Sequence, residues 1–247
     1  ELTRRKLEQV TQKILGEQDY ARAIGSKLTI ISGRAGTGKT IKLLRIACDL
    51  ALHNGARSMI LTYNHALVSD IRRIIAFTGI PDGIDSYTVQ ISTLHSFFHT
   101  IIDGLFGYEI DNNLSFDEVH DLNLRNLIGY ISTGTISDSD IQDLMLKNHE
   151  SVGWDYVMID EAQDWGDLEK EALFRIFGKN RLVVADGVDQ FMRTTKKQDW
   201  TRKLRRDLDF HKKTETIGLR QKTNLVNFIN EFAKEAGINW EITPNKS

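Results

Sequence analysis

The sequence predicts an α/β fold in which a mostly parallel sheet is covered by helices on both faces. Two short, uninterrupted apolar runs, residues 156–159 and 182–185, are typical of strands that are buried on both sides, as in parallel sheets. Segments with helical apolar spacing separate the expected strands, which indicates repeated strand–helix–strand units. A glycine-rich segment, residues 33–40, joins one expected strand to the helix that follows it.

The other expected elements follow from their local patterns. Three segments rich in apolar and β-branched residues are expected to be strands: 28–31, 58–63 and 87–92. Four segments carry apolar residues at helical spacing: 2–15, 41–51, 67–75 and 93–105. Phe97 and Phe98, in the last of these helices, are expected to belong to the core rather than to a base-stacking surface.

Composition limits the classes of protein that this chain can belong to. At 247 residues with 40% hydrophobic content, it can form one large α/β domain or one domain and part of a second. The net charge of −2 gives no overall positive field for nucleic acid. The single cysteine, Cys48, excludes a disulfide within the chain, and no apolar run is long enough to span a membrane. These features predict a cytoplasmic protein.

Two stretches have a biased charge. Residues 103–143 contain nine acidic residues against Arg125 alone, which predicts a solvated helical insertion and makes contact with a phosphate backbone unfavourable. Residues 196–213 contain eight Lys and Arg residues against three Asp residues. This basic stretch could contact nucleic acid, but a solvated helix face is the preferred interpretation.

The glycine-rich segment fits the phosphate-binding pattern G-x-x-x-x-G-K-[ST]. Its residues are Gly33, Arg34, Ala35, Gly36, Thr37, Gly38, Lys39 and Thr40. A strand before it and a helix after it would point backbone N–H groups and a helix N-terminus at a polyphosphate. Lys39 would then contact the β- and γ-phosphates, and the Thr40 hydroxyl could bind Mg²⁺. The sequence therefore predicts a nucleotide-binding protein.

A pair of carboxylates follows the apolar run at residues 156–159. Asp160 and Glu161 come directly after it, which places both at the C-terminal edge of the sheet, where α/β proteins bind ligands. Asp160 is expected to hold Mg²⁺, directly or through water. Glu161 is expected to orient the attacking water and to accept its proton. Together with the phosphate loop, this pair predicts a nucleotide hydrolase.

The segment 160–164, Asp-Glu-Ala-Gln-Asp, resembles the D-E-x-Q-D motif of UvrD/Rep-type superfamily 1 helicases. The resemblance implies a RecA-like P-loop NTPase that couples Mg²⁺-dependent ATP hydrolysis to translocation on single-stranded DNA and to duplex unwinding. It assigns adenine recognition to Gln18, γ-phosphate sensing to Gln190, and a γ-phosphate arginine to Arg220. The cofactors that it implies are ATP and Mg²⁺.

The same resemblance implies contacts with nucleic acid. Residues 62–65 resemble the first DNA-contacting segment of these helicases, and residues 93–96 resemble their T-x-H segment. The residues expected to contact single-stranded DNA are Thr62, Tyr63, Asn64, Thr93 and His95. Tyr63 is the best candidate for stacking on a base.

The chain departs from the helicase pattern at several positions. The usual Gly-Asp pair before the sensing glutamine is reversed here to Asp186-Gly187, and Leu219 replaces an adenine-stacking aromatic residue. A tryptophan that stacks on a base is missing from residues 191–195. The later motifs of the second motor domain, including its second arginine finger, are also missing.

The resemblance therefore implies a first motor domain at residues 1–213, with a helical insertion at 103–150. Residues 214–247 would begin a truncated second motor domain, so the chain alone is expected to be nearly inactive. Two alternatives stay open: an ATP-dependent switch or scaffold that does not translocate, and the helicase part of a helicase–nuclease.

Overall fold

The computed structural model describes residues 23–78, 87–187, 198–206 and 208–218, with residues 227, 230, 231, 234, 243 and 244. The helix expected at residues 2–15 lies outside these ranges. Six strands form one sheet: β1 (Leu28–Gly33), β2 (Arg57–Thr62), β3 (Thr88–Thr93), β4 (Tyr156–Ile159), β5 (Leu182–Gly187) and β6 (Phe210–Glu215). Their spatial order is β3-β2-β4-β5-β1-β6, and each of these pairings is parallel. The predicted parallel α/β fold is thus confirmed.

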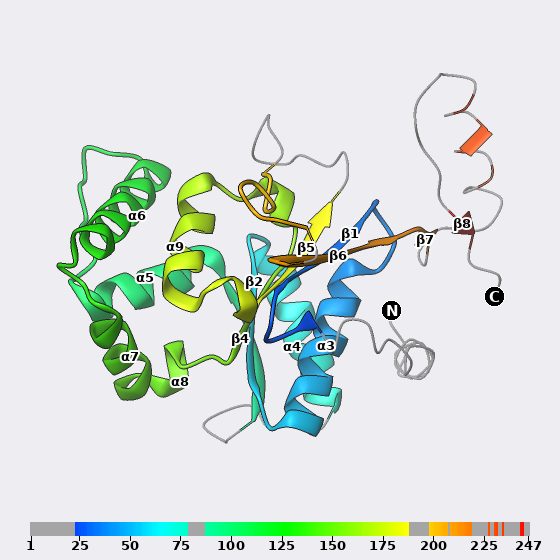
Figure 1. Cartoon of the computed structure of the whole chain (residues 1–247), viewed down its shortest axis with the longest axis horizontal. Coiled ribbons are helices and arrows are strands. Elements are labelled where there is room, and N and C mark those ends of the chain that lie inside the picture. Colours follow the sequence, from blue (N-terminus) through cyan, green and yellow to red (C-terminus); the bar gives the residue numbers. More distant parts are fainter. Residues whose placement is uncertain are drawn as a thin grey trace.

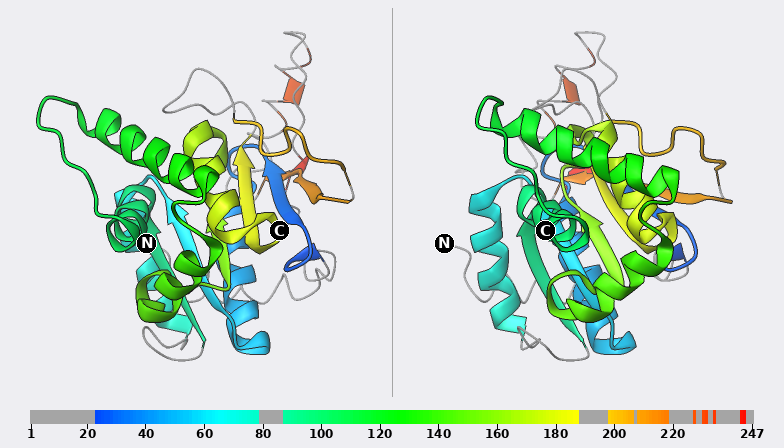
Figure 2. Two further views of the ribbon diagram at one scale, coloured as in Figure 1. Left: turned by 60° about the vertical axis from the view of Figure 1, so that its left-hand side comes forward. Right: turned by 90° about the vertical axis from the view of Figure 1, so that its left-hand side faces the viewer.

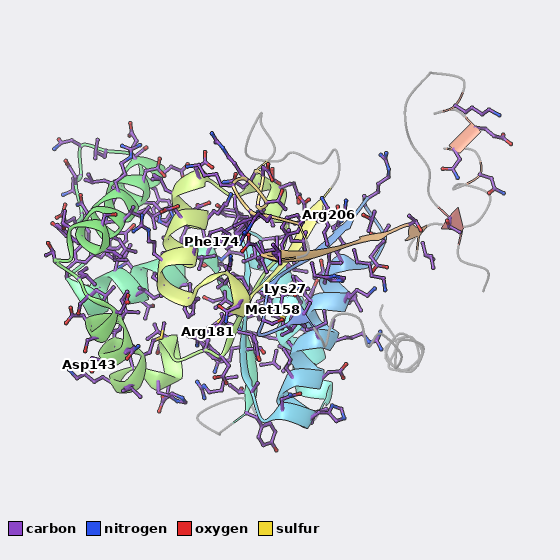
Figure 3. The ribbon with its side chains drawn as sticks, in the orientation of Figure 1. Lys27, Asp143, Met158, Phe174, Arg181 and Arg206 are labelled. Atoms are coloured by element: carbon purple, nitrogen blue, oxygen red, sulfur yellow. The ribbon has the colours of Figure 1, made fainter. Side chains whose placement is uncertain are left out.

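Helices cover both faces of the sheet (Figure 1). On one face, α3 (Lys39–Asn54) and α4 (His65–Thr78) pack against the sheet and form one core. This core includes Ile31 of β1 and Met158 of β4. On the other face, α5 (Leu94–Leu105) and α9 (Asp167–Phe177) pack against a second core. Alternate residues of β1, β2, β4 and β5 belong to the two cores, because successive side chains of a strand point to opposite faces. Figure 3 marks Met158 within the sheet.

The acidic stretch folds as helices outside α5 and α9. These are α6 (Phe116–Thr133) and α7 (Asp138–Lys147), and the short α8 (His149–Val152) follows the stretch. Ser115 and Ser137 begin α6 and α7 as capping boxes with Glu118 and Asp140, so four hydrogen-bonding side chains define the two helix starts. Figure 2 shows α6 projecting beyond the sheet. Among the residues that the structure describes, no helix is both long and apolar enough to cross a membrane.

The prediction of a helix face for the basic stretch is wrong in its described residues, because residues 198–206 form turns and irregular structure rather than a helix. Residues 210–213 belong to β6, which pairs with β1 at the edge of the sheet. After the buried Phe210, the strand alternates between half-buried side chains at His211, Lys213 and Glu215 and exposed ones at Lys212 and Thr214, which is typical of an edge strand with one covered face. The strand continues to Glu215, past the expected domain boundary at 213–214. Beyond it, β7 (Ile217–Gly218) pairs in parallel with β8 (Thr243–Pro244).

Candidate active site

The phosphate-loop sequence connects β1 to α3, and its glycines permit the sharp turn. Gly36 and Gly38 have φ angles of 78° and 80°, a left-handed conformation that favours glycine. A Cβ on Gly33 would lie 2.6 Å from the Thr37 hydroxyl oxygen and 3.0 Å from the Glu215 carbonyl oxygen. Gly33 is therefore required by close packing, whereas the other two glycines are required by backbone conformation.

Lys39 lies folded over the loop at the start of α3. Its Nζ donates hydrogen bonds to the carbonyl oxygens of Gly33, at 2.9 Å, and Arg34, at 3.1 Å. Its side chain is buried, and the first turn of α3 contains no acidic residue and no side-chain cap. A buried ammonium group and the positive end of a helix dipole thus meet at one loop, which favours a bound anion.

Thr40 connects the loop to the acidic segment that follows β4. Its hydroxyl oxygen lies 3.1 Å from each carboxylate oxygen of Asp160. Both residues offer hard oxygen ligands of the kind that Mg²⁺ binds. Among the described residues, no group of three or more His, Cys, Asp or Glu side chains could hold a metal. This oxygen pair therefore fits a Mg²⁺ ion that takes its other ligands from phosphate and water.

Asp160 is completely buried at the end of β4. Burial, reinforced by the neighbouring charge of Glu161, raises the pKa of Asp160 to about 7, although hydrogen bonds from Thr40 and the Glu161 amide and the charge of Lys39 act in the opposite direction. A divalent cation beside this carboxylate would favour its charged form. The electrostatics of the pocket are therefore suited to a cation.

Glu161 has a left-handed backbone, with φ 47° and ψ 45°. For a residue other than glycine this conformation costs about 1–2 kcal/mol. Two hydrogen bonds hold the turn: the Asp164 amide donates to the Glu161 carbonyl, and the Trp165 indole donates to the Asp160 carbonyl. The half-buried Glu161 carboxylate accepts a hydrogen bond from the Gln163 side chain. Strain of this kind is common at functional sites.

The residues predicted to contact nucleic acid lie together at the same edge of the sheet. Thr62 of β2 and Thr93 of β3 are partners in the strand register, so the two segments lie side by side. Thr93 is buried and caps α5 by accepting a hydrogen bond from the Ser96 amide. Asn64 is exposed, and its side-chain oxygen accepts hydrogen bonds from two amides at the start of α4. Their contact with nucleic acid stays a prediction.

Tyr63 and His95 belong to a cluster that the sequence did not indicate. The Tyr63 hydroxyl donates to the buried Glu169 carboxylate of α9, and the His95 ring lies 4.6 Å from the ring of His120 of α6. His120 Nε2 lies 3.5 Å from Glu169 Oε1. The only sequence signal for Glu169 is its position three residues after Gly166, at the expected place for a capping carboxylate.

Three predicted site residues are not placed by the structure. Gln18, Gln190 and Arg220 lie outside the described residues. Adenine recognition and both γ-phosphate contacts therefore stay predictions. The described part of the site consists of the phosphate loop, Asp160 and Glu161.

A family model described as "AAA domain" matches residues 17–195. The chain belongs to the AAA domain family. The matched range contains the phosphate loop and both carboxylates, so this AAA domain is a P-loop nucleotide-binding domain. No curated protein matches the sequence.

Among solved structures, the AAA domain is similar to the crystal structure of Arterivirus nonstructural protein 10, a helicase. The identity is 12% and the TM-score is 0.42, over 92% of this chain and 43% of that chain. The chain thus spans less than half the length of that protein. The parallel strand order described above establishes the fold class independently of this likeness.

Proposed function

We propose that the chain is the ATP-binding core of a superfamily 1-like helicase, which couples Mg²⁺-dependent ATP hydrolysis to movement along single-stranded DNA. The observation that carries the hydrolase part is the contact between the Thr40 hydroxyl and both oxygens of Asp160. It joins the phosphate loop to the acidic end of β4, although 120 residues separate them in the sequence.

Each side chain of the site is proposed to have a separate role in hydrolysis. Lys39 and the amides of the loop bind the β- and γ-phosphates, and Thr40 and Asp160 hold Mg²⁺. When bound, Mg²⁺ neutralises charge on the phosphates. Glu161 accepts a proton from water as the water oxygen bonds to the γ-phosphorus and the bond to the β–γ bridging oxygen breaks, which gives ADP and phosphate. Gln190 and Arg220 are proposed to contact the γ-phosphate.

Nucleic acid is proposed to cross the C-terminal ends of β2 and β3. The supporting observation is that Thr62 and Thr93 lie side by side at the C-terminal ends of these strands, on the same sheet edge as the proposed ATP site. Asn64 is the exposed polar group at this position. Tyr63 and His95 are half-buried, so a base would meet only part of either ring.

Nucleotide binding and hydrolysis test the proposal in two steps. Lys39→Ala should abolish detectable ATP binding in calorimetry and leave the fold intact, because it removes the buried ammonium group of the loop. Lys147→Ala, an exposed lysine at the end of α7, is the matched control. Unchanged ATP affinity in Lys39→Ala would contradict the assignment of the loop.

Glu161→Gln separates binding from chemistry. ATP should still bind, while single-turnover hydrolysis should fall by about a hundredfold or more, because the amide cannot accept the proton. Glu171→Gln is the control: Glu171 is a partly exposed glutamate of α9 that pairs with Arg175. A loss smaller than tenfold would exclude Glu161 as the base and make Asp164 the next residue to test.

Coupling to DNA needs a separate measurement. An arginine finger from a second motor domain typically contributes about 10³–10⁵ in rate. Residues 1–247 alone should therefore hydrolyse ATP more slowly than a protein that has both motor domains. In a protein with both motor domains, single-stranded DNA should stimulate hydrolysis. Absence of stimulation there would favour the switch or scaffold alternative over the motor.

A further inference from the structure

Gln163 makes three hydrogen bonds around the end of β4. Its side-chain Nε2 donates to Glu161 Oε2 at 2.8 Å, and its Oε1 accepts from the Gly187 amide at 2.6 Å. Its carbonyl oxygen accepts from the Gln198 amide at 3.0 Å. Gln163 is 1% exposed. A single buried residue therefore joins three groups: the Glu161 carboxylate, the backbone amide of Gly187 at the end of β5, and the backbone amide of Gln198.

The Gln163 amide occupies the space that a Cβ atom on residue 187 would need. A Cβ on Gly187 would lie 2.6 Å from both Cδ and Oε1 of Gln163 and 2.9 Å from its Nε2. Such distances are too short for real contacts, so only glycine allows the amide to reach the strand. This packing gives a physical reason for glycine as the second residue of the reversed Asp186-Gly187 pair.

The two side-chain hydrogen bonds also fix which way the amide points. The Gly187 N–H can only donate, so the Gln163 oxygen must face β5 and its NH₂ group must face Glu161. Glu161 therefore receives a directed donor rather than a freely rotating one.

We propose that Gln163 is a positioning residue for Glu161: it holds the carboxylate at one orientation in its left-handed turn, with β5 as the fixed support. The inference rests on the proposed function of Glu161 as the base. Because Gln163 acts through Glu161, its loss should lower kcat and leave the KM for ATP nearly unchanged. A misplaced catalytic group typically costs about tenfold to a hundredfold in rate.

Gln163→Glu is the principal variant, because it keeps the side-chain size and the acceptor for the Gly187 amide but replaces the donor to Glu161 by a second carboxylate oxygen. Gln142→Glu introduces the same charge change at an exposed position of α7 and is the matched control. Single-turnover ATP hydrolysis with the protein in excess gives the rate, and fluorescent ATP-analogue binding gives the affinity. Gln163→Glu should be at least tenfold slower than the control, with affinity changed less than threefold.

The double variant with Glu161→Gln distinguishes positioning from general damage. If Gln163 acts through Glu161, adding Gln163→Glu to Glu161→Gln should cause no further loss of rate. Loss factors that multiply in the double variant would overturn the proposal, as would full activity of Gln163→Glu. If Glu161→Gln itself were fully active, the proposed function would fail instead, so the two failures are distinguishable.

Amide exchange supplies a readout that does not depend on turnover. Nitrogen-15 NMR of the Gly187 amide should show slow hydrogen exchange in the wild-type chain and in Gln163→Glu. Faster exchange is expected in Gln163→Ala, which lacks the acceptor. Equal exchange rates in all three proteins would show that Gln163 does not hold the end of β5, and this would also overturn the proposal.

Discussion

Glu169→Ala should be among the most destabilising single substitutions in this chain. The Glu169 carboxylate is 4% exposed and has partners in three segments. Oε2 accepts hydrogen bonds from the Tyr63 hydroxyl and the Gly166 amide, both at 2.5 Å. Oε1 lies 3.5 Å from Nε2 of His120. The carboxylate therefore connects α9, the end of β2 and α6, and alanine would release all three at once.

The expected loss is about 2–4 kcal/mol of unfolding free energy. Loss of the N-terminal cap of α9 contributes about 1 kcal/mol. The Tyr63 hydroxyl, left without its buried acceptor, contributes about 1–3 kcal/mol. These costs overlap, since the Tyr63 side chain can rotate, so they do not add in full. Domains are typically stable by only about 5–15 kcal/mol.

Urea denaturation followed by tryptophan fluorescence measures this loss, because the Trp165 ring lies 5.6 Å from the ring of Tyr63. Tyr63→Phe removes only the hydroxyl and should cost about 0.5–1.5 kcal/mol. Glu171→Ala removes a partly exposed side chain of α9 and its i,i+4 pair with Arg175, and it should change stability by no more than about 0.5 kcal/mol. A loss below about 1 kcal/mol in Glu169→Ala, or one no larger than in Tyr63→Phe, would refute the reasoning.

Two further outcomes are expected. Burial raises the pKa of Glu169, but hydrogen bonds from His120, Tyr63 and the Gly166 amide outweigh it and hold the pKa below its ordinary 4.5. The stability that Glu169 contributes should thus be complete above about pH 4.5, and it should be lost as the pH falls through the lower pKa of the folded protein. The urea midpoint should therefore fall less on acidification in Glu169→Gln than in the wild-type protein. Gly187→Ala should lower stability by about 1–3 kcal/mol in thermal unfolding, because its Cβ overlaps the Gln163 amide; an unchanged midpoint would show that the amide can move aside.

The phosphate loop and the two carboxylates could be predicted from the sequence because each depends on local pattern. A short apolar strand, a glycine turn and a helix start follow one another directly, and the spacing of Gly33, Lys39 and Thr40 sets their geometry. The carboxyl ends of parallel strands meet at one sheet edge, so Asp160 was expected near Thr40. In the structure, the Thr40 hydroxyl lies 3.1 Å from both carboxylate oxygens of Asp160 at that edge.

Strand β6 was missed because its sequence, Phe-His-Lys-Lys-Thr-Glu, contains only one apolar residue. A central strand of a parallel sheet needs apolar residues on both faces, but an edge strand needs only backbone pairing along one side. Lys212 lies 3.8 Å from the carboxylate of Asp186, and Glu215 pairs with Lys42 of α3. These partners are distant in the sequence, so charge counting alone favoured a solvated helix.

The cluster around Glu169 and the role of Gln163 could not be predicted for a related reason. His120 lies in the acidic stretch, residues 103–143, which was predicted to be solvated because of its many charged residues, yet His120 is 2% exposed. The positions of Glu169 and Gln163 relative to their partners depend on how α6, α9 and β5 pack together. Sequence spacing locates residues along one element, but it does not specify which side chains meet across elements.

Trp165 provides a direct physical contact between the candidate ATP site and the segment predicted to bind nucleic acid. Its indole N–H donates to the Asp160 carbonyl at 3.2 Å, and its ring packs edge-on against the ring of Tyr63. The ring is 1% exposed and also contacts Trp200, so it has little free space in which to move independently. Asp160 and Tyr63 are therefore joined through one closely packed side chain, so a shift of the Asp160 carbonyl would move the Trp165 ring against Tyr63.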